Sequence, residues 1–372
     1  MIIAWLSVEN FRNHRSTEIS FDPGRTLVVG PNGHGKTNLL EAVAMLDGSG
    51  SFRGATAETL VRAGSQRAYV RAEIQRRNRS SLVEMEIPAG GRSRAQVNGE
   101  RARSLRDLAE IVTAVVFCPA DLAIAAGGPS MRRSLLDEVL ASTDREFRAA
   151  RADLERILRQ RNNLLKQAGQ RPDSDALNTL DVWDHQFATA GETVVRCRAE
   201  LVEALAPVAQ EAYRQLAGTD ASLELVYVTS WADMSLAAAV AGARSDDLRR
   251  GTTSVGPHRD EMEITLEGLA ARTHASQGEQ RSIALSLRLA QHHYIADRVG
   301  TAPIVLLDDV FSELDEGRAR RLVGCLPGAQ TVVTSATGHV PDGIDIDSRI
   351  EVHDGEVISA SVCHDEPRHP DE

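Results

Sequence analysis

The stretch GPNGHGKT, residues 30–37, decides the fold of this chain of 372 residues. It fits the pattern G-x-x-x-x-G-K-[ST] of a phosphate-binding loop, and its surroundings are those that such a loop needs. The apolar run TLVVG, 26–30, predicts a strand before it, and KTNLLEAVAML, 36–46, predicts a helix after it. We therefore expect a nucleotide to bind at this strand-to-helix turn.

The residue types in this loop suit a nucleoside triphosphate. Glycines free the backbone amides to cradle the phosphates, a lysine reaches the β and γ oxygens, and a hydroxyl binds Mg²⁺. The chain has only two lysines, Lys36 and Lys166, beside 40 arginines, which favours a specific need for a compact point charge at position 36. The loop residues that we expect at the nucleotide are Gly30, Pro31, Asn32, Gly33, His34, Gly35, Lys36 and Thr37.

A second apolar strand ends in two carboxylates. The run IVLLDDV, 304–310, predicts a buried strand, after which Asp308 would hold Mg²⁺ and Asp309 would orient an attacking water. Alone, this pattern would favour a plain strand that ends in an acidic turn, but beside a phosphate loop the functional interpretation is favoured. We expect ATP and Mg²⁺ as cofactors, with Thr37 and Asp308 as metal ligands and Asp309 and Lys36 as catalytic residues.

A third motif opens the helix predicted in ASQGEQRSIALSLRLAQHH, 275–293. The start of a helix favours anions. The segments SQGEQ, LLDD and SELD follow one another as in ATPases of the ABC and SMC type, where this helix start closes over the γ-phosphate held by a second subunit. That resemblance implies an ATP-dependent homodimer, with Ser276 and Gly278 as ligands in trans and Asp315 at the dimer seam. Ser276 is thereby expected as a third catalytic residue. Without the other motifs, the SQGEQ signature would be explained by a capped amphipathic helix.

Charge is distributed unevenly along the chain, whose formal net charge is −11. Residues 53–106 contain twelve arginines and five acidic residues, a balance of +7. Residues 340–372 contain ten acidic residues and two arginines, a balance of −8. The arginine-rich stretch is either a solvated face or a patch for a phosphodiester backbone, because electrostatic binding depends on local potential.

Composition also indicates the compartment. No apolar run approaches the length of about 18 residues that a membrane span needs. The first residues, MIIAWLSVENFRNH, lack the features of a signal peptide. The four cysteines, Cys118, Cys197, Cys325 and Cys363, form no CxxC pair, which argues against a disulfide framework or a zinc site. We expect a cytoplasmic protein without a membrane partner.

Alternating apolar strands and helices predict a mostly parallel α/β core. Within it, heptads over 136–168 and 180–208 predict two helices that form a short antiparallel coiled-coil-like hairpin about 45 Å long, joined by AGQRPDSD. Thr143 and Arg161 intrude on the core positions. We expect a head in two parts, 1–120 and 219–364, an inserted helical arm, 121–218, and a disordered acidic tail, 365–372.

Several motifs together resemble the RecF family of bacterial recombination-repair ATPases. They are NFRNHRS, GPNGHGKTNLLEA, FCPADL, GGPSMRRSLLD, GPHRDE, SQGEQR and LLDDVFSELD, and they span most of the chain. The resemblance implies an ABC-type P-loop ATPase head with a helical arm, slow DNA-stimulated ATP hydrolysis as a switch, and binding of DNA at single-strand gaps and junctions. It also implies work with RecO and RecR to load recombinase, in replication restart and the SOS response.

The resemblance also implies that Arg12 and Asn13 border the nucleotide. The histidine usual after the next strand in ABC transporters is absent, since Ser335 is nearest and His339 is a poor substitute. FCPADL, 117–122, is the expected region of the glutamine loop, and the role of Gly256–Asp260 stays open between a specific function and a plain turn.

Three other functions compete with this interpretation. ABC transporter subunits usually have a shorter span between phosphate loop and signature, and no long heptad hairpin. An SMC-like structural protein would have far longer arms. The third alternative is a scaffold that binds ATP without hydrolysing it, and the sequence alone leaves this alternative open.

Overall fold

The protein is described by a computed structural model, which covers residues 1–77, 79–169 and 173–362. The chain divides into two compact units. The first comprises Met1–Asp121, Ala212–Thr219 and Leu285–Glu372, and the second comprises Leu122–Glu211 and Asp220–Ala284. This division groups 220–284 with the helical segment, whereas the sequence places that stretch in the head. The domain boundaries stay a prediction, and the expected tail, 365–372, lies outside the described residues.

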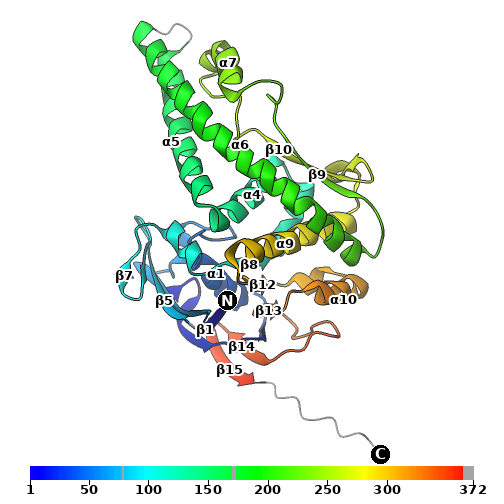
Figure 1. The fold of residues 1–372 in the computed structure, drawn as a ribbon. Helices are drawn as coiled ribbons and strands as arrows, with labels where there is room; N and C mark the ends of the chain where they lie inside the picture. Colours follow the sequence, from blue (N-terminus) through cyan, green and yellow to red (C-terminus); the bar gives the residue numbers. More distant parts are fainter. Residues whose placement is uncertain (78, 170–172, 363–372) are drawn as a thin grey trace, which may run out of the picture. The chain divides into compact units, whose positions relative to one another are not determined.

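The first unit contains a six-stranded sheet in the order β15-β14-β3-β13-β12-β8 (Figure 1). Neighbouring strands from β14 to β8 run parallel, and β15 is antiparallel to β14. Strands β8 and β12 are buried at every residue, as expected for strands covered on both faces. The bounds are β3 Arg25–Val29, β8 Ala114–Phe117, β12 Ile304–Leu307, β13 Thr331–Ser335, β14 Ser348–His353 and β15 Glu356–Val362.

A second sheet of the first unit is antiparallel, in the order β2-β1-β4-β5-β6-β7. Burial alternates along β4 and β5, so one face of the sheet packs inward. Leu6 and Val70 of this sheet belong to one apolar core with Leu40 of α1 and Leu306 of β12. The bounds are β1 Ile2–Phe11, β2 His14–Ser20, β4 Arg67–Arg76, β5 Arg79–Pro88, β6 Arg94–Val97 and β7 Glu100–Arg101.

Among the described residues, three α-helices lie wholly within the first unit, and two long α-helices contribute residues to both units. The first three are α1 Lys36–Met45, α2 Ala57–Leu60 and α10 Glu316–Cys325; the long ones are α6 Ser174–Ala217 and α9 Gln277–Val299. The strand-to-helix order expected around the phosphate loop is confirmed by β3 and α1.

The second unit combines helices with a three-stranded antiparallel sheet in the order β11-β10-β9. Its strands are β9 Leu223–Val228, β10 Glu261–Leu266 and β11 Leu269–Ala270. Its helices are α3 Leu122–Ala126, α4 Pro129–Thr143, α5 Arg145–Ala168, α7 Leu236–Arg250 and α8 Ala271–His274, with most of α6.

The expected continuous helix over 136–168 is wrong at Asp144. There the backbone is extended, with φ −129°, and the Asp144 carboxylate accepts the N–H of Phe147 at 3.0 Å. This side chain therefore ends α4 and caps α5, because Asp is a strong N-cap residue. Helix α5 has 24 residues and spans about 36 Å, so the antiparallel pairing with α6 is shorter than the hairpin expected from the heptads.

The intrusion at Arg161 has a structural cause. Arg161 is fully buried, and its guanidinium donates to Asp184 of α6 and Asp247 of α7, both at 2.7 Å, and to Thr253 at 2.8 Å. Burying an unpaired guanidinium would be very unfavourable, and these partners offset that cost. The second unit is therefore held by an ion-pair cluster as well as by apolar heptad contacts.

Across the described ranges, no helix combines the length and the apolar character that a bilayer span requires.

Candidate nucleotide-binding site

The phosphate loop connects β3 to α1 and adopts a backbone that requires glycine. Gly30 has φ 156°, and a Cβ there would lie 2.1 Å from the carbonyl oxygen of Val352. Gly35 has φ 113°, and a Cβ there would lie 2.7 Å from Nε2 of His14. A side chain at either position would thus collide with the strands behind the loop.

Those strands hold the loop through a chain of hydrogen bonds. The buried His14 contacts the Gly35 carbonyl oxygen through Nε2 at 3.1 Å and Thr17 Oγ1 through Nδ1 at 3.0 Å. Thr17 donates to the Gly355 carbonyl oxygen at 3.0 Å, and the Gly355 N–H donates to the His34 carbonyl oxygen at 2.9 Å. Burial lowers the pKa of His14. This role of His14 could not be predicted from the sequence, because its hydrogen-bond partners come from distant segments.

The side chain of Lys36 folds back onto its own loop. Its ammonium donates to the carbonyl oxygens of Gly30 at 2.8 Å and Pro31 at 3.2 Å, and the residue is 4% exposed. The positive charge therefore lies at the centre of the loop.

The second strand motif meets the loop as the sequence predicts. Thr37 Oγ1 donates to Asp308 Oδ1 at 2.7 Å, and Thr334 Oγ1 donates to the same oxygen at 3.1 Å. Burial raises the pKa of Asp308, partly opposed by these hydroxyl donors. A buried carboxylate beside a hydroxyl provides the oxygen ligands that Mg²⁺ prefers.

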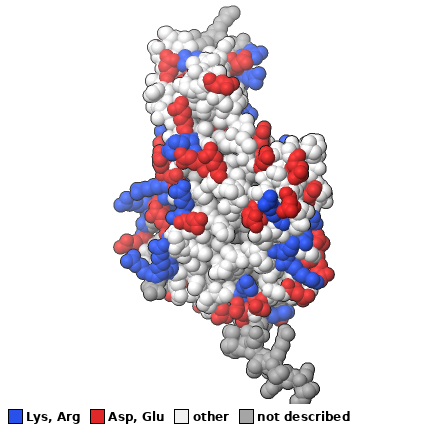
Figure 2. All heavy atoms as spheres, turned by 45° about the vertical axis from the view of Figure 1, so that its right-hand side comes forward, with Lys and Arg blue, Asp and Glu red and all other residues white. Residues whose placement is uncertain are grey.

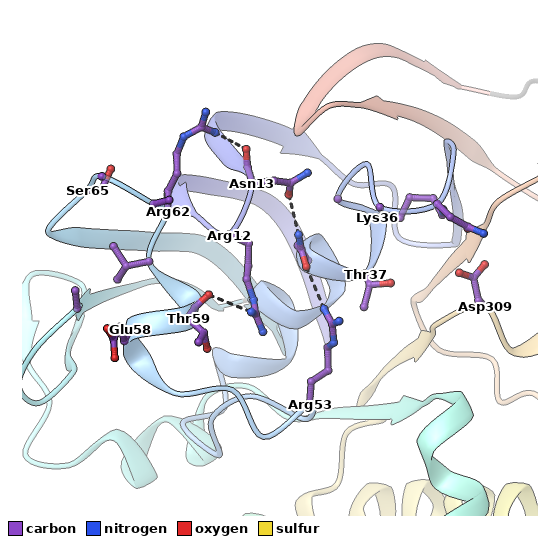
Figure 3. A pocket seen from close by; sticks show the side chains of 18 residues that line it. Arg12, Asn13, Lys36, Thr37, Arg53, Glu58, Thr59, Arg62, Ser65 and Asp309 are labelled. Carbon is purple, nitrogen blue, oxygen red and sulfur yellow. Dashed lines mark hydrogen bonds between the residues drawn. The ribbon is translucent and has the colours of Figure 1, made fainter.

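Asp309 occupies a constrained position after β12. Its φ is 49°, and its N–H donates to Thr334 Oγ1 at 2.9 Å. Its side chain lies beside Lys36 and Thr37 at one end of the cavity (Figure 3).

Lys36, Thr37 and Asp309 line a cavity of about 960 Å³. Most of the expected nucleotide ligands line it, whereas Gly30, Pro31 and His34 belong to the loop but are outside the lining. Ser276 and Gly278 belong to the second unit. The lining residues are Arg12, Asn13, Asn32, Gly33, Gly35, Lys36, Thr37, Asn38, Arg53, Glu58, Thr59, Val61, Arg62, Ala63, Gly64, Ser65, Ala89 and Asp309.

The cavity lining also contains two arginines that the sequence analysis did not predict at the nucleotide. Arg62 donates to the carbonyl oxygen of Asn13, and Arg53 donates to Asn38 Oδ1 at 3.2 Å (Figure 3). Asn38 in turn donates to Asn13 Oδ1 at 2.7 Å. Both arginines come from the arginine-rich stretch, which the sequence alone assigned to a solvated face or a DNA patch.

In the second unit, the start of α9 is capped by its own residues. Glu279 N–H donates to Ser276 Oγ at 3.3 Å, and the Ser276 N–H donates to the Glu279 carboxylate at 2.7 Å. This is a capping box, and Ser276 is exposed. The hydroxyl of Ser276 is therefore placed at an accessible helix start.

The arginine-rich stretch is not uniform. Arg76 donates to the carbonyl oxygens of Glu110 at 2.7 Å and Val299 at 2.9 Å, and Arg77 donates to that of Gly300 at 2.7 Å. These two side chains therefore bind the chain itself, whereas Arg92 and Arg94 are exposed. On the face in Figure 2, basic side chains lie among acidic ones.

Gly256–Asp260 forms a turn that is anchored inside the second unit. Arg198 donates to the Pro257 carbonyl oxygen at 2.8 Å, and Tyr227 Oη donates to Asp260 Oδ2 at 2.9 Å. Burial raises the pKa of Asp260 to about 6. The structure therefore gives this motif a buried polar framework before β10.

Comparison with known proteins agrees with this geometry. The family model for the RecF/RecN/SMC N terminal domain matches residues 2–354. The chain is 41% identical to the DNA replication and repair protein RecF of Streptomyces avermitilis, over 96% of this chain and 99% of that protein. It is 38% identical to the protein of the same name from Acidothermus cellulolyticus, again over 96% and 99%.

Solved structures give the same result. A structure of the recombination mediator protein RecF with ATP, described as part of the RecFOR pathway, matches with a TM-score of 0.88 at 28% identity, covering 97% of each chain. An Smc head domain from Pyrococcus furiosus matches with a TM-score of 0.54 at 17% identity, which shows the fold alone. The expected α/β fold of an ABC-type ATPase head with a helical arm is thereby confirmed, and the chain belongs to the RecF family of DNA replication and repair proteins.

Proposed function

We propose that this chain binds ATP and Mg²⁺ in the cavity beside the phosphate loop and hydrolyses ATP slowly, as a switch. The observation that carries the proposal is the hydrogen bond of Thr37 Oγ1 to the buried carboxylate of Asp308, at 2.7 Å. The RecF structure with ATP supports the choice of nucleotide.

The residues divide the work by their chemistry. Lys36 would exchange the loop carbonyl oxygens for phosphate oxygens, while Thr37 and Asp308 would hold Mg²⁺. When bound, that ion neutralises charge on the β- and γ-phosphates. The Asp309 carboxylate would orient a water and accept its proton, as a general base must. Arg12 and Asn13 would border the nucleotide, together with Arg53 and Arg62.

Dimerisation would complete the site. In this proposal Ser276 and Gly278 of one chain bind the γ-phosphate held by another, so that two chains enclose two ATP molecules. The ATP-bound dimer would bind DNA at single-strand gaps and junctions, work with RecO and RecR to load recombinase, and act in repair of DNA damage, replication restart and the SOS response. A cytoplasmic location is part of the same proposal.

A trapped dimer tests the proposal. In Asp309→Asn the amide keeps the shape of the carboxylate but cannot act as a base, so ATP should bind while hydrolysis slows by about 10²-fold or more. Size-exclusion chromatography with light scattering should show that the variant is a dimer with ATP and a monomer with ADP. The complex of the ATP-bound variant with gapped DNA should dissociate more slowly than the wild-type complex. Wild-type hydrolysis by the variant, or a monomer under every condition, would contradict the proposal.

A further inference from the structure

Three side chains that commonly bind metals lie together beside the phosphate loop. They are His34 of the loop, His353 at the end of β14 and Asp354 in the turn that follows. One ligand atom of each residue lies within 4.8 Å of those of the other two. None of the three lines the nucleotide cavity, so the cluster is separate from the pair Thr37 and Asp308.

The backbone holds the cluster in place. The Gly355 N–H donates to the His34 carbonyl oxygen at 2.9 Å, and the Asp354 N–H donates to His34 Nδ1 at 3.0 Å. Asp354 and Gly355 have φ 49° and 81°, as in a tight hairpin turn. The rings of His34 and His353 have centroids 4.4 Å apart. The turn therefore presents two of the ligands to the third without further folding.

The spacing of the atoms suits a metal ion. His34 Nδ1 lies 3.2 Å from Oδ1 of Asp354, and a metal ion bound at Nδ1 would replace the Asp354 N–H as the partner of its lone pair. The other Asp354 oxygen lies 3.4 Å from His353 Nδ1. Ligand atoms at about 2.0–2.1 Å from a tetrahedral metal lie roughly 3.3 Å apart, close to both distances.

We propose that His34, His353 and Asp354 bind a divalent transition metal ion such as Zn²⁺, which links the phosphate loop to the β14–β15 turn. Two imidazoles and one carboxylate suit Zn²⁺, whereas Mg²⁺ prefers oxygen ligands alone. His353 and Asp354 are exposed and His34 is 23% exposed at its side chain, so a fourth position is open to water. The proposal does not depend on ATP hydrolysis.

Metal titration tests this site directly. Zn²⁺ is titrated into untagged, chelator-treated protein without nucleotide, against a chromogenic chelator, because phosphates themselves bind the ion. We expect one ion per chain. His353→Ala should weaken binding by at least about tenfold, the scale seen when even an outer partner of a metal ligand is lost. The matched control is His293→Ala, which removes an exposed histidine of α9 outside the cluster and should leave the affinity unchanged.

A second variant keeps the test independent of misfolding. Asp354→Asn removes a charged ligand but preserves the turn, since Asn tolerates positive φ. It should also weaken Zn²⁺ binding, and Zn²⁺ should raise the unfolding temperature of wild type and His293→Ala more than that of either cluster variant. The proposal is overturned if wild type binds no Zn²⁺, if the cluster variants bind it as tightly as wild type, or if Zn²⁺ leaves the wild-type unfolding temperature unchanged.

Discussion

Arg12 and Glu41 form a two-point ion pair, with Nε and Nη2 of the arginine each 2.8 Å from a carboxylate oxygen. Glu41, on α1, is fully buried, and Arg12 lines the cavity. The third nitrogen, Nη1, donates to the Thr59 carbonyl oxygen at 3.0 Å. Arg12 thus links α1 to the segment that contains Thr59. These contacts use three of its five N–H donors, so that two are left for a nucleotide.

Breaking this pair should cost stability. Glu41→Gln removes the charge that compensates Arg12 inside the core, and loss of one partner of a buried ion pair costs about 3–5 kcal/mol. Urea unfolding would measure the loss. Glu58→Gln is the control, because Glu58 lines the same cavity but is exposed, and its change should stay within about 0.5 kcal/mol. Equal stability of the two variants would show that the pair is dispensable.

The chain offers its own control for the phosphate-loop lysine. Lys36→Ala should abolish tight ATP binding, because it removes the charge at the centre of the loop. Lys166→Ala removes the only other lysine, an exposed residue of α5, and should leave ATP affinity unchanged. An equilibrium titration with a fluorescent ATP analogue compares the two. Unchanged affinity in Lys36→Ala would defeat the assignment of the loop.

The arginines of the basic stretch should separate into two classes. Arg92→Glu with Arg94→Glu should weaken DNA binding and reduce the slope of log K against log salt by about 2 if each arginine neutralises one phosphate. Arg76→Glu should instead lower the unfolding free energy, since Arg76 holds the carbonyl oxygens of Glu110 and Val299. Binding titrations across salt concentrations and urea unfolding read the two effects. If charge reversal at Arg92 and Arg94 leaves the DNA affinity unchanged, these arginines belong to a solvated face and not to a DNA-binding patch.

A buried histidine makes stability depend on pH. Burial lowers the pKa of His292 from 6.5 to about 4, and its Nε2 contacts the Pro303 carbonyl oxygen at 3.2 Å. Between these two values the unfolded chain binds a proton that the folded chain does not, so stability falls as the pH falls through this window. The full loss is at most roughly 3.4 kcal/mol, because the two pKa values differ by about 2.5 and each pKa unit corresponds to about 1.36 kcal/mol.

His292→Gln should reduce that loss, because its amide can still donate to Pro303 but cannot titrate. Urea unfolding at about pH 7.5 and about pH 5 gives the difference. His293→Gln changes an exposed neighbour and should keep the wild-type pH dependence. If His292→Gln also loses as much stability as wild type on acidification, another buried group is responsible, and His14 and His258, whose pKa values are also lowered by burial, come next.

Local patterns predicted those parts of the fold that local chemistry controls. The glycine spacing of 30–37 predicted the phosphate loop, and the apolar runs before Lys36 and Asp308 predicted the two strands that lead to it and to the carboxylates. Each of these elements is specified by residues close together in the chain. The break at Asp144 was missed because the heptad pattern continues through it while a single capping side chain ends the helix. The sequence did not predict the positions of three side chains at the site: Arg53, Arg62 and Glu41. The residues next to each of them in the chain do not show which part of the cavity or core the side chain contacts. Such contacts depend on tertiary packing between segments far apart in the chain.

The opening of α9 gives the last test, of the proposed site between two chains. If Ser276 serves the opposite subunit, Ser276→Arg should leave ATP binding to the monomer nearly intact, since Lys36 and its loop are unchanged. The bulky cation should block ATP-induced dimerisation, and hydrolysis should fall with it. Ser276→Gly also removes the proposed γ-phosphate ligand but adds no bulk and keeps the helix start, because glycine is tolerated at an N-cap at a cost of only a few tenths of a kcal/mol. Its unfolding free energy therefore checks that loss of the capping box does not by itself disrupt the fold.

Mixing two inactive variants separates the trans site from a cis site. A heterodimer of Ser276→Arg and Lys36→Ala chains contains one composite site with an intact Lys36 from the first chain and an intact Ser276 from the second. Some ATP hydrolysis should therefore return on mixing, up to half the wild-type rate per dimer if the two sites act independently. A serine that serves its own chain predicts the opposite: ATP affinity of the Ser276→Arg monomer would fall, and mixing would restore nothing. Titration of ATP into each variant, followed by hydrolysis rates at several mixing ratios, distinguishes these outcomes.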